Sequence, residues 1–402
     1  MLAYARKVLQ WEEHLDSVTD SRPRPEIATT VVMRSAAVMF LSRLGSLNAF
    51  EQSAKSTFWH KWLGRAPPSA DTMGRVASLA DADEIRRLGH AIYSRLKRNK
   101  ALKPFACGTL VAILDGHESH ATYRQHCKGC LERTIHTTKG DRIQYYHRHV
   151  TLQLVGPEMC LLLDAEAVRP GEGEIAAGLR LLERVIQAYP RAFDIVLGDA
   201  LYADANVFNY VLSKGKDIIA VLKDERRDLF ADAFSLFDET SPVMLRRDNR
   251  QCECWDIEGF TSWPQVNRPV RVVRSVERYT VHRQLTDQDE QLEANWMWVT
   301  TLSAKRVSTG GVVHFGHLRW KIENEGFNEL STRWHADHVY KHDPQAILVF
   351  CLLAMVCLNV FLAFYRFNLK PARRQAYSML HISRLIAAEL YQSIAGPPRA
   401  PT

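Results

Sequence analysis

Cysteine is scarce in this sequence, and the cysteines present are scattered. Eight of them are spread through 402 residues, and the opening stretch MLAYARKVLQWEEH has no signal-peptide pattern. Small secreted scaffolds concentrate their cysteines in short chains, so we do not expect a disulfide framework. A reducing, cytoplasmic location fits this composition better.

Long hydrophobic runs are nearly absent as well. One stretch, AILVFCLLAMVCLNVFLAFYRF (346–367), is long enough to cross a bilayer, although it carries Asn359 and two cysteines. Because it is the single such stretch and polar segments flank it, we expect a buried core helix. A membrane anchor is the alternative, and cell fractionation would separate the two.

Neither sign of charge dominates the sequence. Lys and Arg number 52 against 45 Asp and Glu, which gives a net charge of +7 and a pI near 8.9. This mild basic excess fits a polyanionic partner, but many enzymes carry as much. With 46% hydrophobic residues, the chain can bury the cores of two or three globular domains.

Residues 1–104 are predicted to be a helical N-terminal region. The stretch 27–52 is apolar at helical spacing, and 81–104 begins with acidic residues and ends with basic ones. That order of charges complements the helix dipole. A DNA-contacting helical module is the functional interpretation of the same pattern, and both stay open here.

Residues 105–345 are predicted to form an α/β domain. Its order is three strands, a helix, a strand, a helix and a strand, which is typical of a ribonuclease-H-like fold. A β-rich insertion is expected at about 223–301 and a C-terminal helical region at 346–402. The predicted strands are 108–116, 148–156, 159–168, 193–200 and 217–223, and the helices are 171–190 and 204–215.

Two of these strands end in the same way. VAILD closes on Asp115 and IVLGD closes on Asp199. In the predicted topology these strands are neighbours, so both carboxylates meet at one edge of the sheet. Two such carboxylates repel each other unless a cation lies between them, and hard divalent ions prefer oxygen ligands. An aspartate that merely caps a turn is the alternative for either one.

A third carboxylate follows the insertion. Arg319 and Glu323 are four residues apart in a helical segment and so share a face. A surface ion pair is the simple interpretation. The functional one makes Glu323 the third carboxylate of an Asp, Asp, Glu triad, with Arg319 binding phosphate beside it.

With these residues in place, the chain resembles a DDE transposase of a bacterial insertion sequence. Arg319 and Glu323 match the Y-x2-R-x3-E-x6-K signature of one large group, and GDALYAD (198–204) resembles the motif around that group's second aspartate. The tyrosine and lysine positions of the signature fall on Gly316 and Leu330, so the chain is expected to be a divergent member.

The resemblance implies Mg²⁺-dependent (or Mn²⁺-dependent) cleavage and joining of double-stranded DNA at transposon ends, by a two-metal mechanism on Asp115, Asp199 and Glu323. It also implies a homodimer in the synaptic complex. Trp320 and Trp334 are candidates for stacking on an extruded base, or else core residues. A metal-dependent nuclease of the same fold and a catalytically inactive DNA-binding remnant are the alternative functions.

A cysteine and histidine cluster lies between the first two predicted strands. Cys127 and Cys130 form a CxxC within HESHATYRQHCKGCLERTIHTTKGDRIQYYHRHV (117–150), which contains six histidines. A structural Zn²⁺ ion bound by both cysteines and two histidines is one interpretation. A polar, basic loop lying on DNA is the other. His117 and Glu118, next to Asp115, are candidates for orienting a metal-bound water.

Overall fold

The computed structural model describes residues 1–223 and 227–391. The predicted C-terminal region, 346–402, is therefore described as far as residue 391, and 392–402 lie outside the described residues. Residues 224–226 of the predicted insertion also lie outside them.

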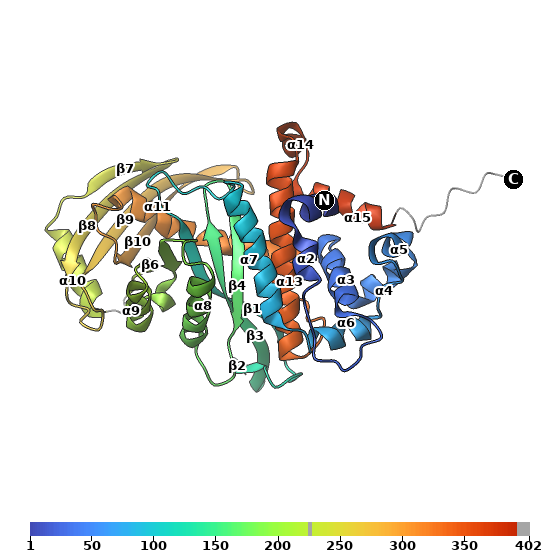
Figure 1. Cartoon of the computed structure of the whole chain (residues 1–402). Coiled ribbons are helices and arrows are strands. Elements are labelled where there is room, and N and C mark those ends of the chain that lie inside the picture. Colours follow the sequence, from blue (N-terminus) through green and yellow to red (C-terminus); the bar gives the residue numbers. More distant parts are fainter. Residues whose placement is uncertain (224–226, 392–402) are drawn as a thin grey trace.

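One mixed sheet organises the described part of the chain (Figure 1). Its ten strands follow the order β2-β3-β1-β5-β6-β10-β9-β8-β7, and β4 pairs with β3. The strands are β1 (Val111–Thr122), β2 (Leu131–Thr137), β3 (Gly140–Val155), β4 (Cys160–Ala167), β5 (Ile195–Gly198), β6 (Asp217–Val221), β7 (Val243–Arg247), β8 (Arg250–Phe260), β9 (Val270–Arg283) and β10 (Gln288–Thr300).

The part of the sheet that holds the site has the predicted ribonuclease-H-like order. β4, β3 and β1 pair antiparallel, whereas β1, β5 and β6 pair parallel. Parallel strands need crossover connections, and helices supply them: α8 (Glu174–Ala188) precedes β5, and η3 (Ala200–Tyr202) with α9 (Ala205–Ser213) precedes β6. The predicted α/β fold class is confirmed.

The β-rich segment after β6 continues this sheet. It begins with a helix, α10 (Arg227–Asp238), and its last strand, β10, pairs antiparallel with β6. The four strands β7–β10 thus extend the sheet by hairpin pairing, at the left end in Figure 1. The chain then enters α11 (Thr309–Leu318), the π-helical turn η5 (Ile322–Phe327) and α12 (Asn328–Trp334).

The apolar stretch predicted as a core helix is α13 (Pro344–Ala363), which packs against β4, α7 and α3. It is the single helix of the described chain long and apolar enough to span a membrane, and 78% of its most apolar window is buried. Asn359 accepts a hydrogen bond from the backbone N–H of Leu162 (3.0 Å) and donates one to its carbonyl (2.7 Å). The polar side chain therefore anchors α13 to the sheet, as expected of a core helix.

The remaining helices lie at the two ends of the chain and pack around α13. Figure 1 shows α13 between the sheet and the N-terminal helices that precede α7, whereas α7 lies beside α13 and also packs against β4. The N-terminal elements are α1 (Leu2–Tyr4), η1 (Ala5–Leu9), α2 (Trp11–Leu15), α3 (Thr29–Leu41), α4 (Leu47–Gln52), η2 (Ser53–Lys55), α5 (Thr57–Leu63), α6 (Ala70–Ala77) and α7 (Ala82–Arg98). The C-terminal ones are η6 (Phe364–Asn368), α14 (Pro371–Ala376) and α15 (Met379–Tyr391).

The segment 117–150 differs from the loop that its polar sequence suggested. β1 continues as far as Thr122, and β2 and β3 form a hairpin that pairs with it beyond the core. We call this extension, residues 117–149, the β-arm. It carries the CxxC in the connection between β1 and β2.

Candidate active site

Strand register places the two aspartates at the same level. β1 and β5 pair parallel with Val111 opposite Ile195 and Ile113 opposite Leu197. The same offset carries Asp115 to the level of Asp199, the residue that follows β5. The backbone N–H of Leu201 donates to Asp199 (2.9 Å), so this aspartate also caps the short helix η3. The two aspartates lie at the same level, as predicted, but Asp115 does not end its strand: β5 stops before Asp199, whereas β1 continues past Asp115 to Thr122.

Side-chain alternation directs Asp115 toward the helix that carries Glu323. Alternate strand residues face the same side of a sheet, so Asp115 is in phase with Val111 and Ile113. The side chains of Val111 and Ile113 pack in one core cluster with Leu318 of α11 and Ile322 of η5. The hydrophobic packing that seats this helix therefore also brings its polar residues over Asp115.

Arg319 connects two of the three carboxylates. Its Nη1 donates to Oδ2 of Asp115 (3.1 Å) and to Oε1 of Glu323 (3.0 Å). The Arg319 side chain is only 11% exposed, so this is more than a surface ion pair. Glu323 lies in the first turn of η5, and such π-helical turns occur often at functional sites. Among the described residues, the oxygens of Asp115, Asp199 and Glu323 do not all lie within 4.8 Å of one another, and Arg319 links Asp115 to Glu323 but not to Asp199.

The environment of Asp115 disfavours its charged form. Burial, and then the negative charges of Asp199 and Glu174, raise the pKa of Asp115 to about 7. The Arg319 guanidinium and the backbone N–H of Gly116 act in the opposite direction. A carboxyl group with this pKa is half protonated near neutral pH and gains a strong preference for a nearby cation.

Glu174 is a fourth carboxylate that the sequence interpretation missed. It begins α8 on the opposite side of the sheet, accepts hydrogen bonds from Tyr202 (2.8 Å) and Arg148 (3.0 Å), and its pKa is raised by burial. A Cβ at Gly116 would lie 2.4 Å from its carboxyl group. The glycine after Asp115 therefore leaves the space for Glu174. In the sequence, Glu174 is only an acidic residue in the first turn of a predicted helix. Such residues are common because they complement the helix dipole, so this one did not stand out.

The raised pKa of Asp115 gives a prediction for stability. The folded chain favours the protonated form of Asp115. The stabilisation that this preference gives is fully present below pH 3.8, the pKa of the carboxyl in the unfolded chain, and it is lost as the pH rises toward about 7. At 1.36 kcal/mol per pKa unit, its upper limit is about 4 kcal/mol. We expect Asp115→Asn to raise the free energy of unfolding at pH 8, without metal, by about 1–3 kcal/mol. Urea unfolding at pH 8 and at pH 4, where the gain should nearly vanish, tests this, and a loss of stability at pH 8 would contradict it.

Comparison with known families supplies the identity. The sequence profile of the transposase DDE domain matches residues 106–360, which includes the site strands, η5 and most of α13. The chain belongs to this transposase family. No curated protein matches the chain significantly. DNA is therefore the substrate class of this transposase, and its family generally uses divalent metal ions.

The donor set of this transposase fits such a metal ion. Asp115, Asp199 and Glu323 offer hard oxygen ligands, which Mg²⁺ and Mn²⁺ prefer. A guanidinium nitrogen already bridges two of them, so these carboxylates accept a shared cation. The crowded negative charge that raises the pKa of Asp115 is also what a divalent ion would neutralise.

The two departures from the family signature have different surroundings. At Gly316, where the signature has tyrosine, a Cβ would lie 2.4 Å from the indole of Trp298. No larger side chain fits there without moving that tryptophan. Leu330, at the lysine position, is buried in the core.

The two candidate stacking residues lie in opposite environments. Trp320 is 41% exposed and packs beside the Arg319 guanidinium, 4.4 Å from its ring centroid. Trp334 is 1% exposed, donates to Glu329 (3.2 Å) and packs edge-on against Phe361. Trp334 therefore has the core role that was its alternative, whereas Trp320 offers a ring face next to the site.

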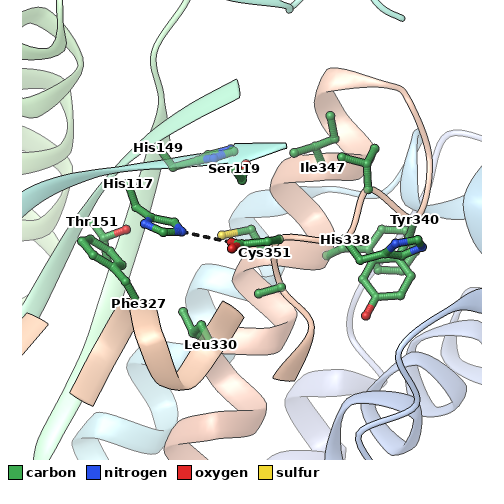
Figure 2. Close-up of a pocket in the computed structure, with 14 residues that line it drawn as sticks. His117, Ser119, His149, Thr151, Phe327, Leu330, His338, Tyr340, Ile347 and Cys351 are labelled. Atoms are coloured by element: carbon green, nitrogen blue, oxygen red, sulfur yellow. Dashed lines mark hydrogen bonds and ion pairs between the residues drawn. The ribbon is translucent and has the colours of Figure 1, made fainter. Parts of the chain in front are cut away.

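A small pocket adjoins the site along the same face of β1 and β3 (Figure 2). His117 stacks on Phe327 and forms a hydrogen bond with Asp337 (3.0 Å), the dashed line in Figure 2. Glu118 faces the other way and pairs with Arg133 (2.7 Å). Both residues thus have partners of their own, and neither contacts the three carboxylates through an observed hydrogen bond among the described residues.

The cysteines of the CxxC come together with one histidine. Cys127 and Cys130 lie beside His147 of β3. A second group, of His120, His126 and His342, lies nearby. Neither group includes a residue of the acidic site.

Proposed function

We propose that this chain cleaves DNA at the ends of an insertion sequence and joins the freed 3′ ends to a target, using Mg²⁺ or Mn²⁺ held by Asp115, Asp199 and Glu323. The observation that carries the proposal is that the parallel register of β1 and β5 brings Asp115 and Asp199 side by side, while Arg319 links Asp115 to Glu323. Membership of the transposase DDE domain family supports it.

The chemistry divides between the metal and the side chains. A divalent ion bound there would activate a water or a 3′ hydroxyl and stabilise the leaving oxygen. Asp115 and Asp199 fix the donor oxygens because their strands pair in register. Arg319 keeps the pKa of Asp115 lower than burial alone would set it. We propose that the guanidinium of Arg319 also binds the scissile phosphate of the DNA. Trp320 adds an exposed ring for a displaced base.

Further proposals follow from the family. We infer that the transposase acts in the cytoplasm as a homodimer that holds two transposon ends. We also propose three regions, with the N-terminal helical region 1–104 contacting DNA, the catalytic domain at 105–345 and a C-terminal region at 346–402, which is helical where the structure describes it. The basic balance of the chain supports phosphate contacts.

The test uses duplex DNA from the flanks of the coding sequence, together with a supercoiled target. We expect Mg²⁺-dependent cutting at a repeat boundary and a joined product with the target. Cutting without joining would favour a metal-dependent nuclease instead. Salt-sensitive binding without any cutting would favour the inactive remnant.

A further inference from the structure

Three side chains of the β-arm converge on one point away from the acidic site. Sγ of Cys127 and Sγ of Cys130 lie 3.8 Å apart, and Nε2 of His147 lies 3.5 Å from the first and 3.6 Å from the second. We propose that these three residues, with His120 as the fourth ligand, bind one structural Zn²⁺ ion. This proposal is independent of DNA cleavage.

The spacing is that of a tetrahedral zinc site. With Zn–S of about 2.3 Å and Zn–N of about 2.0–2.1 Å, tetrahedral geometry separates two sulfurs by about 3.8 Å and a sulfur and a nitrogen by about 3.5 Å. All three observed separations agree with these values. A disulfide requires sulfurs about 2.05 Å apart, so Cys127 and Cys130 are not bonded to each other.

Hydrogen bonding alone explains this arrangement poorly. A single ring nitrogen, Nε2 of His147, lies at similar distances from both sulfurs, although it can make one hydrogen bond. His147 and Cys130 are both buried, as is usual for a closed structural site.

A distortion of β1 points to His120 as the fourth ligand. The β1–β3 register shifts between Ser119 and Ala121, and His120 has a left-handed backbone with φ of 53°. A bulge of this kind re-aims a side chain that regular alternation would send to the other face. Nε2 of His120 is buried and has no hydrogen-bond partner among the described residues. Its ring nitrogens are not within 4.8 Å of all three of the other ligand atoms, so the His120 side chain must move closer to complete the site.

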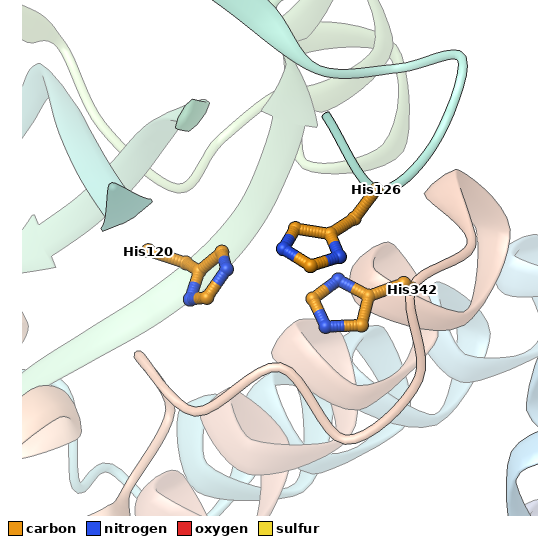
Figure 3. A group of neighbouring side chains, drawn as sticks. All are labelled: His120, His126 and His342. Carbon is orange, nitrogen blue, oxygen red and sulfur yellow. The ribbon is translucent and has the colours of Figure 1, made fainter. Parts of the chain in front are cut away.

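Two further histidines complete the surroundings. Figure 3 shows the rings of His126 and His342 lying face to face, with His120 beside them. The stacked centroids are 4.2 Å apart, and ring nitrogens of all three histidines lie within 4.8 Å of one another. We assign His126 and His342 to the surroundings, because both are exposed while Nε2 of His120 is buried.

The site joins the β-arm to the segment that follows the Glu323 helix. The CxxC turn packs on the start of α13, because a Cβ at Gly129 would lie 2.8 Å from Pro344. His147 pairs with Ser119, four residues along β1 from Asp115, or about 13 Å. Zinc bound here would hold the arm in place beside the acidic site while staying separate from it.

Zinc content of the purified full-length chain is the first test. We expect about one zinc per chain, and at least tenfold weaker zinc binding after Cys127→Ser, Cys130→Ser, His147→Ala or His120→Ala. The matched controls are Cys107→Ser and His136→Ala, an exposed cysteine and an exposed histidine, and these should bind zinc normally. A zinc-free chain from zinc-supplemented cells, or equal losses in the controls, would overturn the site. Normal binding by His120→Ala with loss in His342→Ala would overturn the fourth ligand.

Two measurements on the wild-type chain keep the proposal testable even if the substituted chains fail to fold. Co²⁺ in place of zinc should give the strong visible absorption of a tetrahedral site together with a thiolate charge-transfer band. Zinc should also slow alkylation of Cys127 and Cys130 at least tenfold without changing that of Cys107, as mapped by peptide mass spectrometry. Absence of the thiolate band, or equal protection of Cys107, would contradict the proposal. None of these measurements depends on whether the chain cuts DNA.

Discussion

Asp115→Asn should lower Mg²⁺-dependent cleavage of transposon ends by at least about 10³-fold, while DNA affinity stays within about threefold. The substitution keeps the shape of the side chain and removes its charge. Asp115 is buried and its pKa is raised to about 7, so a bound cation would favour its ionised form. An amide cannot supply that negative charge, and the donor set then loses its most enclosed member.

The matched control for this substitution is Glu118→Gln. Glu118 lies three residues further along β1, and its carboxylate pairs with Arg133 instead of facing the site. It should keep cleavage within about threefold. Asp199→Asn and Glu323→Gln should match the loss of Asp115→Asn, and a double variant should be little worse, because the three groups act as a unit. Normal cutting by any one of these variants would remove that carboxylate from the site.

Arg319→Ala is expected to have the second-largest effect, about 10²-fold on cleavage at saturating Mg²⁺. The guanidinium bridges Asp115 and Glu323, and its loss removes the bridge that connects them. It also removes the positive charge that lowers the pKa of Asp115. The pKa of Asp115 should therefore be higher in Arg319→Ala. In the metal-free variant, the free energy of unfolding should keep falling with rising pH beyond pH 7.

Controls for Arg319 separate charge from shape. Arg319→Lys should recover the pH dependence, because it restores the charge, and only part of the cleavage rate, because lysine lacks the planar fork. Arg133→Ala removes an arginine that pairs with a carboxylate of the β-arm and should leave the cleavage rate nearly unchanged. If Arg319→Ala cleaved at the wild-type rate, the bridge would have no part in catalysis.

The sequence predicted the two aspartates because their signals are local. Each follows a short apolar run, and the parallel pairing of β1 with β5 follows from the crossover helix between them. Arg319 and Glu323 were found by their four-residue spacing. The core role of α13 was also predictable, because it is the single long apolar stretch of the sequence and polar segments flank it.

Other features depend on contacts between distant segments. Glu174 reaches the site because Gly116 leaves room for it, and no spacing in the sequence encodes that approach. The sequence does not predict most of the β-arm as strands, because its residues are polar on both faces and lack the alternation that marks a half-buried strand. Nothing in the sequence spacing singled out His147 among the histidines of the arm; strand pairing brings it to the CxxC.

The most direct test of the acidic site locates the metal itself. Fe²⁺ replaces Mg²⁺ at many oxygen sites, and with ascorbate and peroxide it cuts the backbone beside the ion. In the zinc-loaded, full-length chain we predict cuts near Asp115, Asp199 and Glu323, all suppressed by excess Mg²⁺ and all lost in Asp115→Asn. Cuts that are confined to other segments, or that persist in Asp115→Asn, would contradict a metal site shared by these three carboxylates.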